Sequence, residues 1–152
     1  MVDEPVVLDS DTLSELGRGN AAARERALAY LSNFGRLTIT AVTVFERLRG
    51  YRLALEQGKS FEKQLQAFEA LVRSCVVLPF DEAAASVAAE IWARISRKQQ
   101  QGLGDILIAS IAVSHGLPLV TRNRRDFEAI ARASGIKLRL ADWCRMTRKS
   151  PR

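Results

Sequence analysis

The sequence predicts a single α/β domain in which a short parallel sheet of about five strands is flanked by helices on both faces (α/β/α). Three observations predict this class. Short apolar segments alternate with longer amphipathic segments along the whole chain, as in repeated strand–helix units. The 152 residues are 47% hydrophobic, which suffices for one packed core. No internal repeat divides the chain, so we expect one domain over 1–143 and a basic tail over 144–152.

The predicted strands are short apolar runs rich in β-branched residues. The first is the most informative, because Pro5–Leu8 runs directly into the carboxylate of Asp9 with no turn residue between them. Helical segments separate the strands, so we expect them to be parallel, with their carboxyl ends at one edge of the sheet. The expected strands are 5–8, 37–40, 75–78, 119–121 and 137–140.

The predicted helices have apolar residues at intervals of three or four, and most of them begin at a capping side chain or end at a glycine. Ser60 and Asp81 are expected N-caps, and Gly17 is expected to end the first helix. The longest helix runs from Asp81 to about Gln99, with Trp92 packed in the core. The expected helices are 11–16, 21–34, 42–57, 61–72, 81–99, 106–115 and 126–134.

The composition excludes several kinds of chemistry. Two cysteines without a CxxC pair and a single histidine leave no zinc site, no Ser-His-Asp triad and no Cys-His dyad. The longest apolar run, Ile106–Val113, is far shorter than the roughly 20 residues that span a bilayer, and the N-terminus has no signal-peptide pattern. We therefore expect a soluble cytoplasmic protein. The net charge of +6 favours an anionic partner, although a cationic surface also serves solubility.

Four acidic residues fall at one edge of this predicted sheet. Asp9 ends the first strand, Glu46 lies in the first turns of the helix after the second, and Asp105 and Asp126 lie at helix N-termini. Singly, each aspartate is an ordinary helix cap. Together, crowded carboxylates need a cation, and oxygen donors without histidine suit Mg²⁺ or Mn²⁺. Glu46 alone would be a solvated helix residue, so only the constellation of four favours a metal site over these separate roles.

Thr121 and Asn123 lie beside this predicted site. Thr121 leaves the fourth strand at the same edge, and Asn123 follows in the loop before Asp126. Their hydroxyl and amide groups can orient a carboxylate or a bound phosphate. The alternative is turn chemistry, in which both side chains satisfy backbone groups.

Four stretches of the chain resemble PIN-domain ribonucleases of the VapC toxin type. They are VVLDSDTLSEL, TAVTVFERLRG, LGDILIASIAVSHGLPLVTRNRRDF and RLADW, in that order, and they cover about residues 5–143. The TRN segment with its following Asp-Phe is the most specific part. The resemblance implies a PIN fold and a Mg²⁺- or Mn²⁺-dependent endoribonuclease of a type II toxin–antitoxin system. It also implies a cognate VapB-like antitoxin that neutralises the toxin.

The resemblance also implies roles for individual residues. Asp9, Glu46 and Asp105 match the three core acidic positions, and Asp126 matches a fourth, more variable one. Asp9, Asp105 and Asp126 would hold the metal, with Glu46 acting directly or through water, and activated water would attack the RNA phosphodiester. Thr121 and Asn123 match the segment that supports the acidic cluster. Asp11 stands where the family usually has asparagine, so its role stays open between site and helix cap.

The partner surfaces are also expectations. The candidates for RNA phosphate contacts are Arg122, Arg124 and Arg125, around Asn123, and Arg47 and Arg49, which flank Glu46. Apolar stripes on the helices at 43–57 and 60–72 exceed the needs of a small core, so we expect them to meet the antitoxin or a second protomer, with a homodimer and a hetero-oligomer as the assemblies.

Two other functions compete with the nuclease. A PIN-like module without catalysis could bind RNA or protein, but carboxylates at an RNA-binding edge repel phosphate unless a metal is present. A HAD-type phosphatase is a weaker alternative, because Thr12 follows Asp11 by one position rather than two and no later paired acidic motif is evident.

Overall fold

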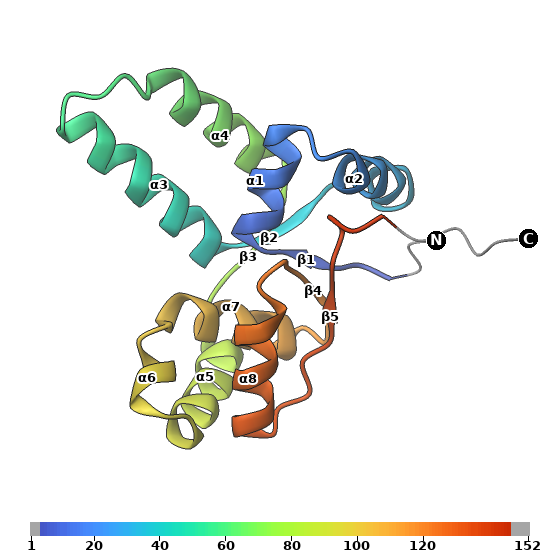
Figure 1. Ribbon diagram of the computed structural model, residues 1–152, viewed down its shortest axis with the longest axis vertical. Coiled ribbons are helices and arrows are strands. Elements are labelled where there is room, and N and C mark those ends of the chain that lie inside the picture. Colours follow the sequence, from blue (N-terminus) through green and yellow to red (C-terminus); the bar gives the residue numbers. More distant parts are fainter. Residues whose placement is uncertain (1–3, 147–152) are drawn as a thin grey trace, which may run out of the picture.

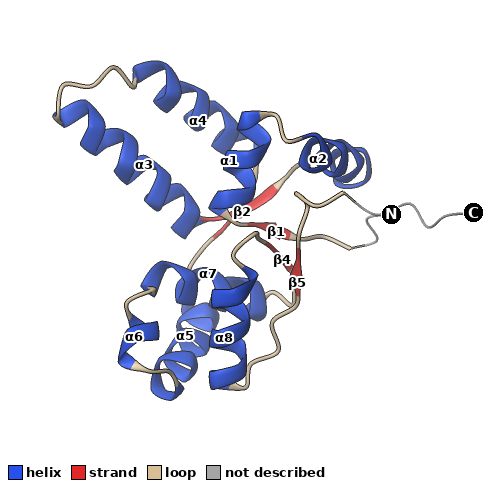
Figure 2. Ribbon diagram, viewed as in Figure 1, coloured by secondary structure: helices blue, strands red, loops and turns tan. Residues whose placement is uncertain are grey.

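A computed structural model describes residues 4–146, and in this part of the chain a layer of short strands lies between two groups of helices (Figure 1). Helices α1–α4 lie on one side of the strands and α5–α8 on the other (Figure 2). This arrangement confirms the predicted α/β class. The elements are β1 (Val7–Leu8), α1 (Ser10–Arg18), α2 (Ala21–Phe34), β2 (Thr38–Thr40), α3 (Ala41–Glu56), α4 (Glu62–Ser74), β3 (Val76–Leu78), α5 (Glu82–Arg94), α6 (Arg97–Gln100), α7 (Leu103–Ser114), β4 (Leu119–Val120), α8 (Arg124–Ser134) and β5 (Leu140–Ala141).

All described strand pairs are parallel, but they do not form the single five-stranded sheet that we expected. One sheet has the order β1-β4-β5, and β2 pairs with β3 in a second sheet. The largest sheet thus has three strands. The strands are short because β1 and β2 run into α1 and α3 without a loop, at Asp9 and at Thr40. Two or three residues of strand leave few backbone groups with which to build a wider sheet.

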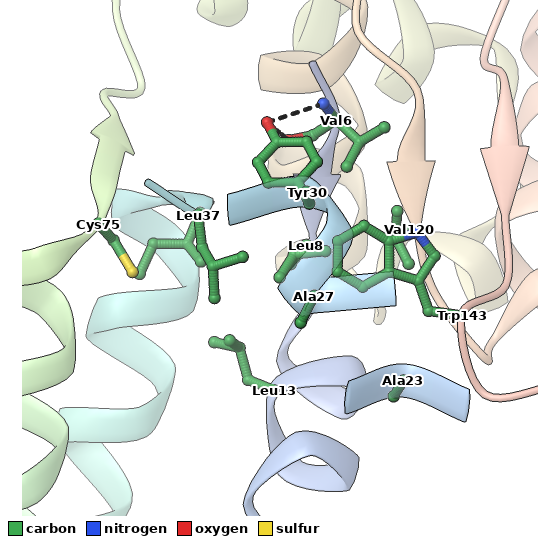
Figure 3. Close-up of a cluster of buried hydrophobic side chains, with 11 residues drawn as sticks. Val6, Leu8, Leu13, Ala23, Ala27, Tyr30, Leu37, Cys75, Val120 and Trp143 are labelled. Atoms are coloured by element: carbon green, nitrogen blue, oxygen red, sulfur yellow. Dashed lines mark hydrogen bonds between the residues drawn. The ribbon is translucent and has the colours of Figure 1, made fainter. Parts of the chain in front are cut away.

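The first hydrophobic core fills the space between the strands and helices α1 and α2 (Figure 3). Val6 and Leu8 point into it, and the ring of Tyr30 lies against that of Trp143 with 5.7 Å between the centroids. The Tyr30 hydroxyl accepts a hydrogen bond from the Val6 amide at 3.2 Å, so the largest fully buried side chain in this layer keeps its polar atom paired.

The second core lies on the opposite face of the strands. Val7, between Val6 and Leu8 in sequence, points to this side and packs with Leu119, Ile108 and Phe127 from β4, α7 and α8. This alternation is the period of two that a strand buried on both faces requires. The two cores hold the ends of β1 and β4 side by side, which positions the residues that follow them.

Helices α3 and α4 form a hairpin that extends away from the sheets (Figure 1). Aromatic contacts join the two helices: the ring of Tyr51 lies 5.9 Å from Phe68 and 6.3 Å from Phe61. The Phe/Leu stripe of α4 was predicted to serve the core or a helix–helix contact, and Phe68, which is 4% exposed, confirms that prediction.

The prediction of one continuous helix from Asp81 to about Gln99 was wrong. Asp81 does cap α5 through the amide of Ala84, but the helix ends at Arg94, because Ile95 is extended and buried and Ser96 begins α6 with a capping box. The helical spacing continues across this break, so periodicity alone could not reveal it. Trp92 is 43% exposed, and its predicted place in the core was also wrong.

Three boundaries also differ from the predictions. Helix α1 continues through Gly17 and ends at Gly19, whose φ of 87° suits a C-cap without a Cβ. Phe61, not Ser60, is the N-cap of α4, and no side-chain bond caps it. The last strand begins at Leu140, three residues later than expected. Within the described residues, no helix is long and apolar enough to cross a membrane. Most of the predicted basic tail, residues 147–152, lies outside the described residues.

Candidate active site

Asp9 both caps a helix and lies at the centre of the candidate site. Its Oδ1 accepts a hydrogen bond from the Ser10 amide at 2.8 Å, which caps α1. Its Oδ2 accepts one from the buried hydroxyl of Thr121 at 2.9 Å. The two interpretations that the sequence left open, cap and site, are therefore compatible, because each uses a different oxygen.

Asp11 joins the same network, which sequence reasoning did not reveal. Its Oδ2 accepts hydrogen bonds from the Thr121 hydroxyl at 3.2 Å and from the backbone amides of Arg122 and Asn123 at 3.1 and 3.2 Å. Because β1 and β4 are neighbours, the first turn of α1 faces the loop that leaves β4. Asp11 thus fixes that loop to α1. The signal in the sequence was its position two residues after a strand-ending aspartate.

Asp105 and Asp126 occupy equivalent places in two helices. Each is the third residue, of α7 and of α8, and neither is the N-cap, since Gly102 and Asn123 hold those positions. Helix α7 therefore begins three residues earlier than predicted, and α8 two residues earlier. The Asn123 side-chain amide donates a hydrogen bond to Asp105 Oδ2 at 3.4 Å. The side-chain capping alternative fails for both aspartates, although the positive end of each helix still favours them.

Glu46 reaches this group from α3 through a gap left by a glycine. Its Oε2 would lie only 2.6 Å from a Cβ at Gly104, in the first turn of α7. The close approach needs a residue without a side chain. Glu46 and Asp105 line one cavity of about 340 Å³ between α3 and α7. Nothing in the helical pattern of the sequence marked Gly104 for this purpose.

Burial and neighbouring acids raise the pKa of two carboxyls in this group, those of Asp9 and Asp105. Burial, followed by the nearby charge of Asp11, raises the pKa of Asp9 to about 7. Burial, then Glu46, Asp126 and Asp11, raise the pKa of Asp105 to about 6. Raised carboxyl pKa values in a cleft mark functional candidates. The four predicted acids and Asp11 thus share one electrostatic neighbourhood, in which ionised carboxylates need a compensating cation.

The chemistry of the donor set fits a hard divalent cation. All the acidic ligands offer oxygen, and no histidine or cysteine of residues 4–146 joins them. Within that range the carboxylates do not form a ready-made cluster of three around one point. Both oxygens of Asp9 and one oxygen of Asp105 accept hydrogen bonds from other groups of the protein.

Two cavities meet at Asp105. The cavity of about 340 Å³ carries Phe45, Glu46 and Arg49 on its wall. A second cavity of about 370 Å³ lies between α6 and α8 and is lined by Lys98 and Asp126. Gly102 and Asp105 line both, so the acidic group lies at the junction of two hollows with a cation beside each. Of this lining, the sequence suggested the acids and Arg49.

The predicted phosphate contacts around Asn123 lie near the site, with different partners. Arg122 forms an ion pair with Glu15 at 2.9 Å, and Arg124 forms one with Glu128 at 3.4 Å. Arg125 is exposed and has no ion pair among residues 4–146. All three arginines lie in the loop and first turn next to Asp126, and their contact with RNA stays a prediction.

Arg47 lies away from the acidic group. Its guanidinium donates to the Ser14 hydroxyl at 2.6 Å and lies 5.4 Å from the centre of the Phe68 ring. It lines an apolar cavity of about 620 Å³ between α1, α3 and α4, together with Leu13 and Tyr51. Glu46 and Arg47 are adjacent in sequence but project from different sides of α3, and this placement lends no support to an RNA contact for Arg47.

Comparison with known proteins gives a consistent result. Residues 6–133 match the PIN domain family. Over 124 residues the chain is 36% identical to the tRNA(fMet)-specific endonuclease VapC of Shigella flexneri, covering 81% of this chain and 85% of that protein. It is 31% identical over 128 residues to the VapC ribonuclease Y4jK of Sinorhizobium fredii, covering 82% of this chain and 91% of that protein.

Solved structures agree with the sequence matches. A chain in the crystal structure of DNA-bound VapBC from Salmonella typhimurium has a TM-score of 0.73 and 31% identity, covering 92% of this chain and 98% of that one. A chain of VapBC-1 from nontypeable Haemophilus influenzae has a TM-score of 0.72 at 24% identity, which shows the fold alone, with 93% of this chain and 100% of that chain covered. The chain therefore belongs to the PIN-domain family, as a homologue of the VapC ribonucleases.

Proposed function

We propose that the protein is a metal-dependent endoribonuclease toxin that hydrolyses RNA phosphodiester bonds. The observation that carries the proposal is the convergence of Asp9, Glu46, Asp105 and Asp126 from four separate elements on one region of raised carboxyl pKa. The homology to VapC ribonucleases supports the same chemistry.

In this proposal Asp9, Asp105 and Asp126 hold Mg²⁺ or Mn²⁺, and Glu46 acts directly or through water. The bound ion would supply a lowered pKa for water and charge neutralisation at the phosphate. Thr121 holds the Asp9 carboxylate through its hydroxyl, which keeps that side chain in one orientation. Asn123 does the same for Asp105.

The remaining polar groups keep the substrate and the loop in place. Asp11 holds the backbone of residues 122–123, so the arginines on that segment keep a fixed position beside the site. Arg122, Arg124 and Arg125 are the proposed phosphate contacts. Since they carry their charge next to the acids, they would offset the repulsion between carboxylates and RNA.

We also infer a VapB-like antitoxin partner, a homodimer and a toxin–antitoxin hetero-oligomer, acting in the cytoplasm. Several solved relatives are VapBC assemblies, which supports the partnership. The apolar cavity of about 620 Å³ between α1, α3 and α4, lined by Leu13, Tyr51 and Phe68 among others, is a suitable place for an apolar partner segment. Co-expression with a candidate antitoxin, followed by co-purification and loss of RNA cleavage, tests this inference.

Cleavage of RNA by the purified protein tests the nuclease itself. A panel that includes initiator tRNA, the substrate named for two relatives, is incubated with Mg²⁺, with Mn²⁺ and with EDTA. We expect cleavage that requires the metal and is lost in Asp9→Asn and Asp105→Asn. Glu25→Gln, at an exposed position on α2, is the matched control and should cleave like the wild type.

The two alternatives give different results in the same assay. RNA binding without cleavage in any metal would indicate a PIN-like module without catalysis. Hydrolysis of small phosphate monoesters with no cleavage of RNA would indicate a phosphatase.

A further inference from the structure

Beside the acidic group an aromatic ring is left open to solvent. Phe45 is 60% exposed, although it immediately precedes Glu46 and lies in the second turn of α3. Its ring forms part of the wall of the cavity that holds Glu46 and Asp105. Burying an aromatic side chain is favourable, so a ring left this open beside a reactive site marks a surface that a ligand can cover.

A cation lies against the same ring. The guanidinium carbon of Arg49, one helical turn later, is 5.3 Å from the centre of the Phe45 ring, within the range of a cation–π contact. Arg49 lines the same cavity. It has no ion pair with an acid in the described part of the chain, so its charge is available to an anion.

An aromatic ring next to a guanidinium without an ion-pair partner is a combination that binds single-stranded RNA. Unpaired bases stack on aromatic side chains and on guanidinium planes, while the neighbouring phosphate pairs with the cation. A double helix would not fit this use, because its bases are already stacked and turned inward. The cavity at Asp105 then receives the phosphate that is cut, and the ring receives the base next to it.

We propose that Phe45 and Arg49 form a stacking platform for one unpaired nucleobase of the RNA, adjacent to the scissile phosphate. The proposal rests on the nuclease function and assigns two residues beside the acidic group that bind its substrate. Phe45 and Arg49 bind and orient the substrate and take no part in proton transfer.

RNA binding by a cleavage-deficient protein tests the platform. In the Asp105→Asn background, fluorescence anisotropy gives Kd values for a short single-stranded RNA with Mg²⁺ present. Phe45→Leu keeps an apolar side chain but removes the ring, and we expect binding about tenfold weaker, the size of one lost stacking contact. Phe45→Tyr retains the ring and should bind within about twofold of the parent. Phe34→Leu, at another exposed phenylalanine on α2, is the matched control.

Abasic RNA locates the contact. A series in which one base at a time is removed should show a single position whose loss weakens binding about tenfold with Phe45 present and has almost no effect in Phe45→Leu. Arg49→Gln should reduce the salt dependence of binding by roughly the slope of one phosphate contact.

Three results would overturn the platform. The Kd of Phe45→Leu for RNA could equal that of Phe34→Leu. The loss of affinity in Phe45→Leu could also be the same whichever base has been removed from the RNA. The substitution could also change the oligomeric state by light scattering while RNA binding stays intact, which would assign Phe45 to a subunit contact. Failure of the wild-type protein to cleave any RNA would instead refute the nuclease function. The cleavage assay measures this separately from RNA binding.

Discussion

The substitution Gly104→Ala should displace the Glu46 carboxylate without destabilising the fold. The added Cβ would lie 2.6 Å from Glu46 Oε2 and 3.2 Å from its Cδ. Ordinary contact begins at 3.4 Å, so the carboxylate must withdraw by about 0.8 Å. A displacement of about 1 Å in a reacting group can cost about 100-fold in rate, and we therefore expect RNA cleavage to fall about 10- to 100-fold.

Stability should move in the opposite direction. Glu46 can turn away at its flexible end, and alanine is the better helix former by up to about 1 kcal/mol. Tm should therefore stay constant or rise by up to about 3 °C. Gly50→Ala is the matched control: Gly50 lies within α3, a Cβ there would meet nothing within 4 Å, and its φ is not positive.

The measurements are cleavage rate at saturating metal and thermal unfolding by circular dichroism for both variants. We expect Gly50→Ala to gain stability and keep full activity. If Gly104→Ala cleaves RNA as fast as Gly50→Ala, the close approach of Glu46 to α7 has no catalytic importance. If it unfolds at a clearly lower Tm, then the surroundings of Gly104 are more rigid than the end of a glutamate side chain.

Three further outcomes follow from the hydrogen bonds and pKa values. The pKa of Asp9 in the folded protein is raised to about 7 from 3.8, so the protonated carboxyl stabilises the metal-free protein at low pH. This stabilisation is lost as the pH rises from about 4 to 7, and Tm should fall over this range. Added Mg²⁺ or Mn²⁺ should raise Tm more at about pH 8 than at about pH 5. Asp11→Asn removes a neighbouring negative charge, so the pKa of Asp9, followed by carboxyl NMR in the metal-free protein, should fall. An unchanged value would mean that the charge of Asp11 does not contribute to the rise. Thr121→Val leaves Asp9 Oδ2 without its donor and should lower the free energy of unfolding by about 1–3 kcal/mol in urea titrations, together with cleavage; wild-type stability would show that another group replaces the hydroxyl.

The sequence predicted the class of fold and the convergence of the acids because both follow from local signals. Asp9 follows a β-branched run, and parallel strands bring the residues that follow them to one edge. Asp105 and Asp126 were recognised at helix starts, although their helices begin two residues earlier. These features depend on a few neighbouring residues, so a single sequence contains them.

The features that escaped prediction depend on distant parts of the chain. Asp11 receives its partners from residues 121–123, and Gly104 matters only because α3 passes beside α7. The break at Ile95 and the exposure of Trp92 arise from how α5 packs on α7 and α8, which periodicity cannot reveal. The division of the strands into two sheets likewise depends on pairing and not on composition.

The bond between Thr121 and Asp9 joins residues that are 112 positions apart in the chain. β4, which places Thr121, pairs with β1 on one side and with β5, at Leu140–Ala141, on the other. The first aspartate of the site is thus translated 112 residues before the threonine that holds its carboxylate. Until β4 has been synthesised and has paired with β1, the chain lacks the assembled acidic group. The toxin would become able to cut RNA only after β4, and the aspartate of α8 that follows it, have been added.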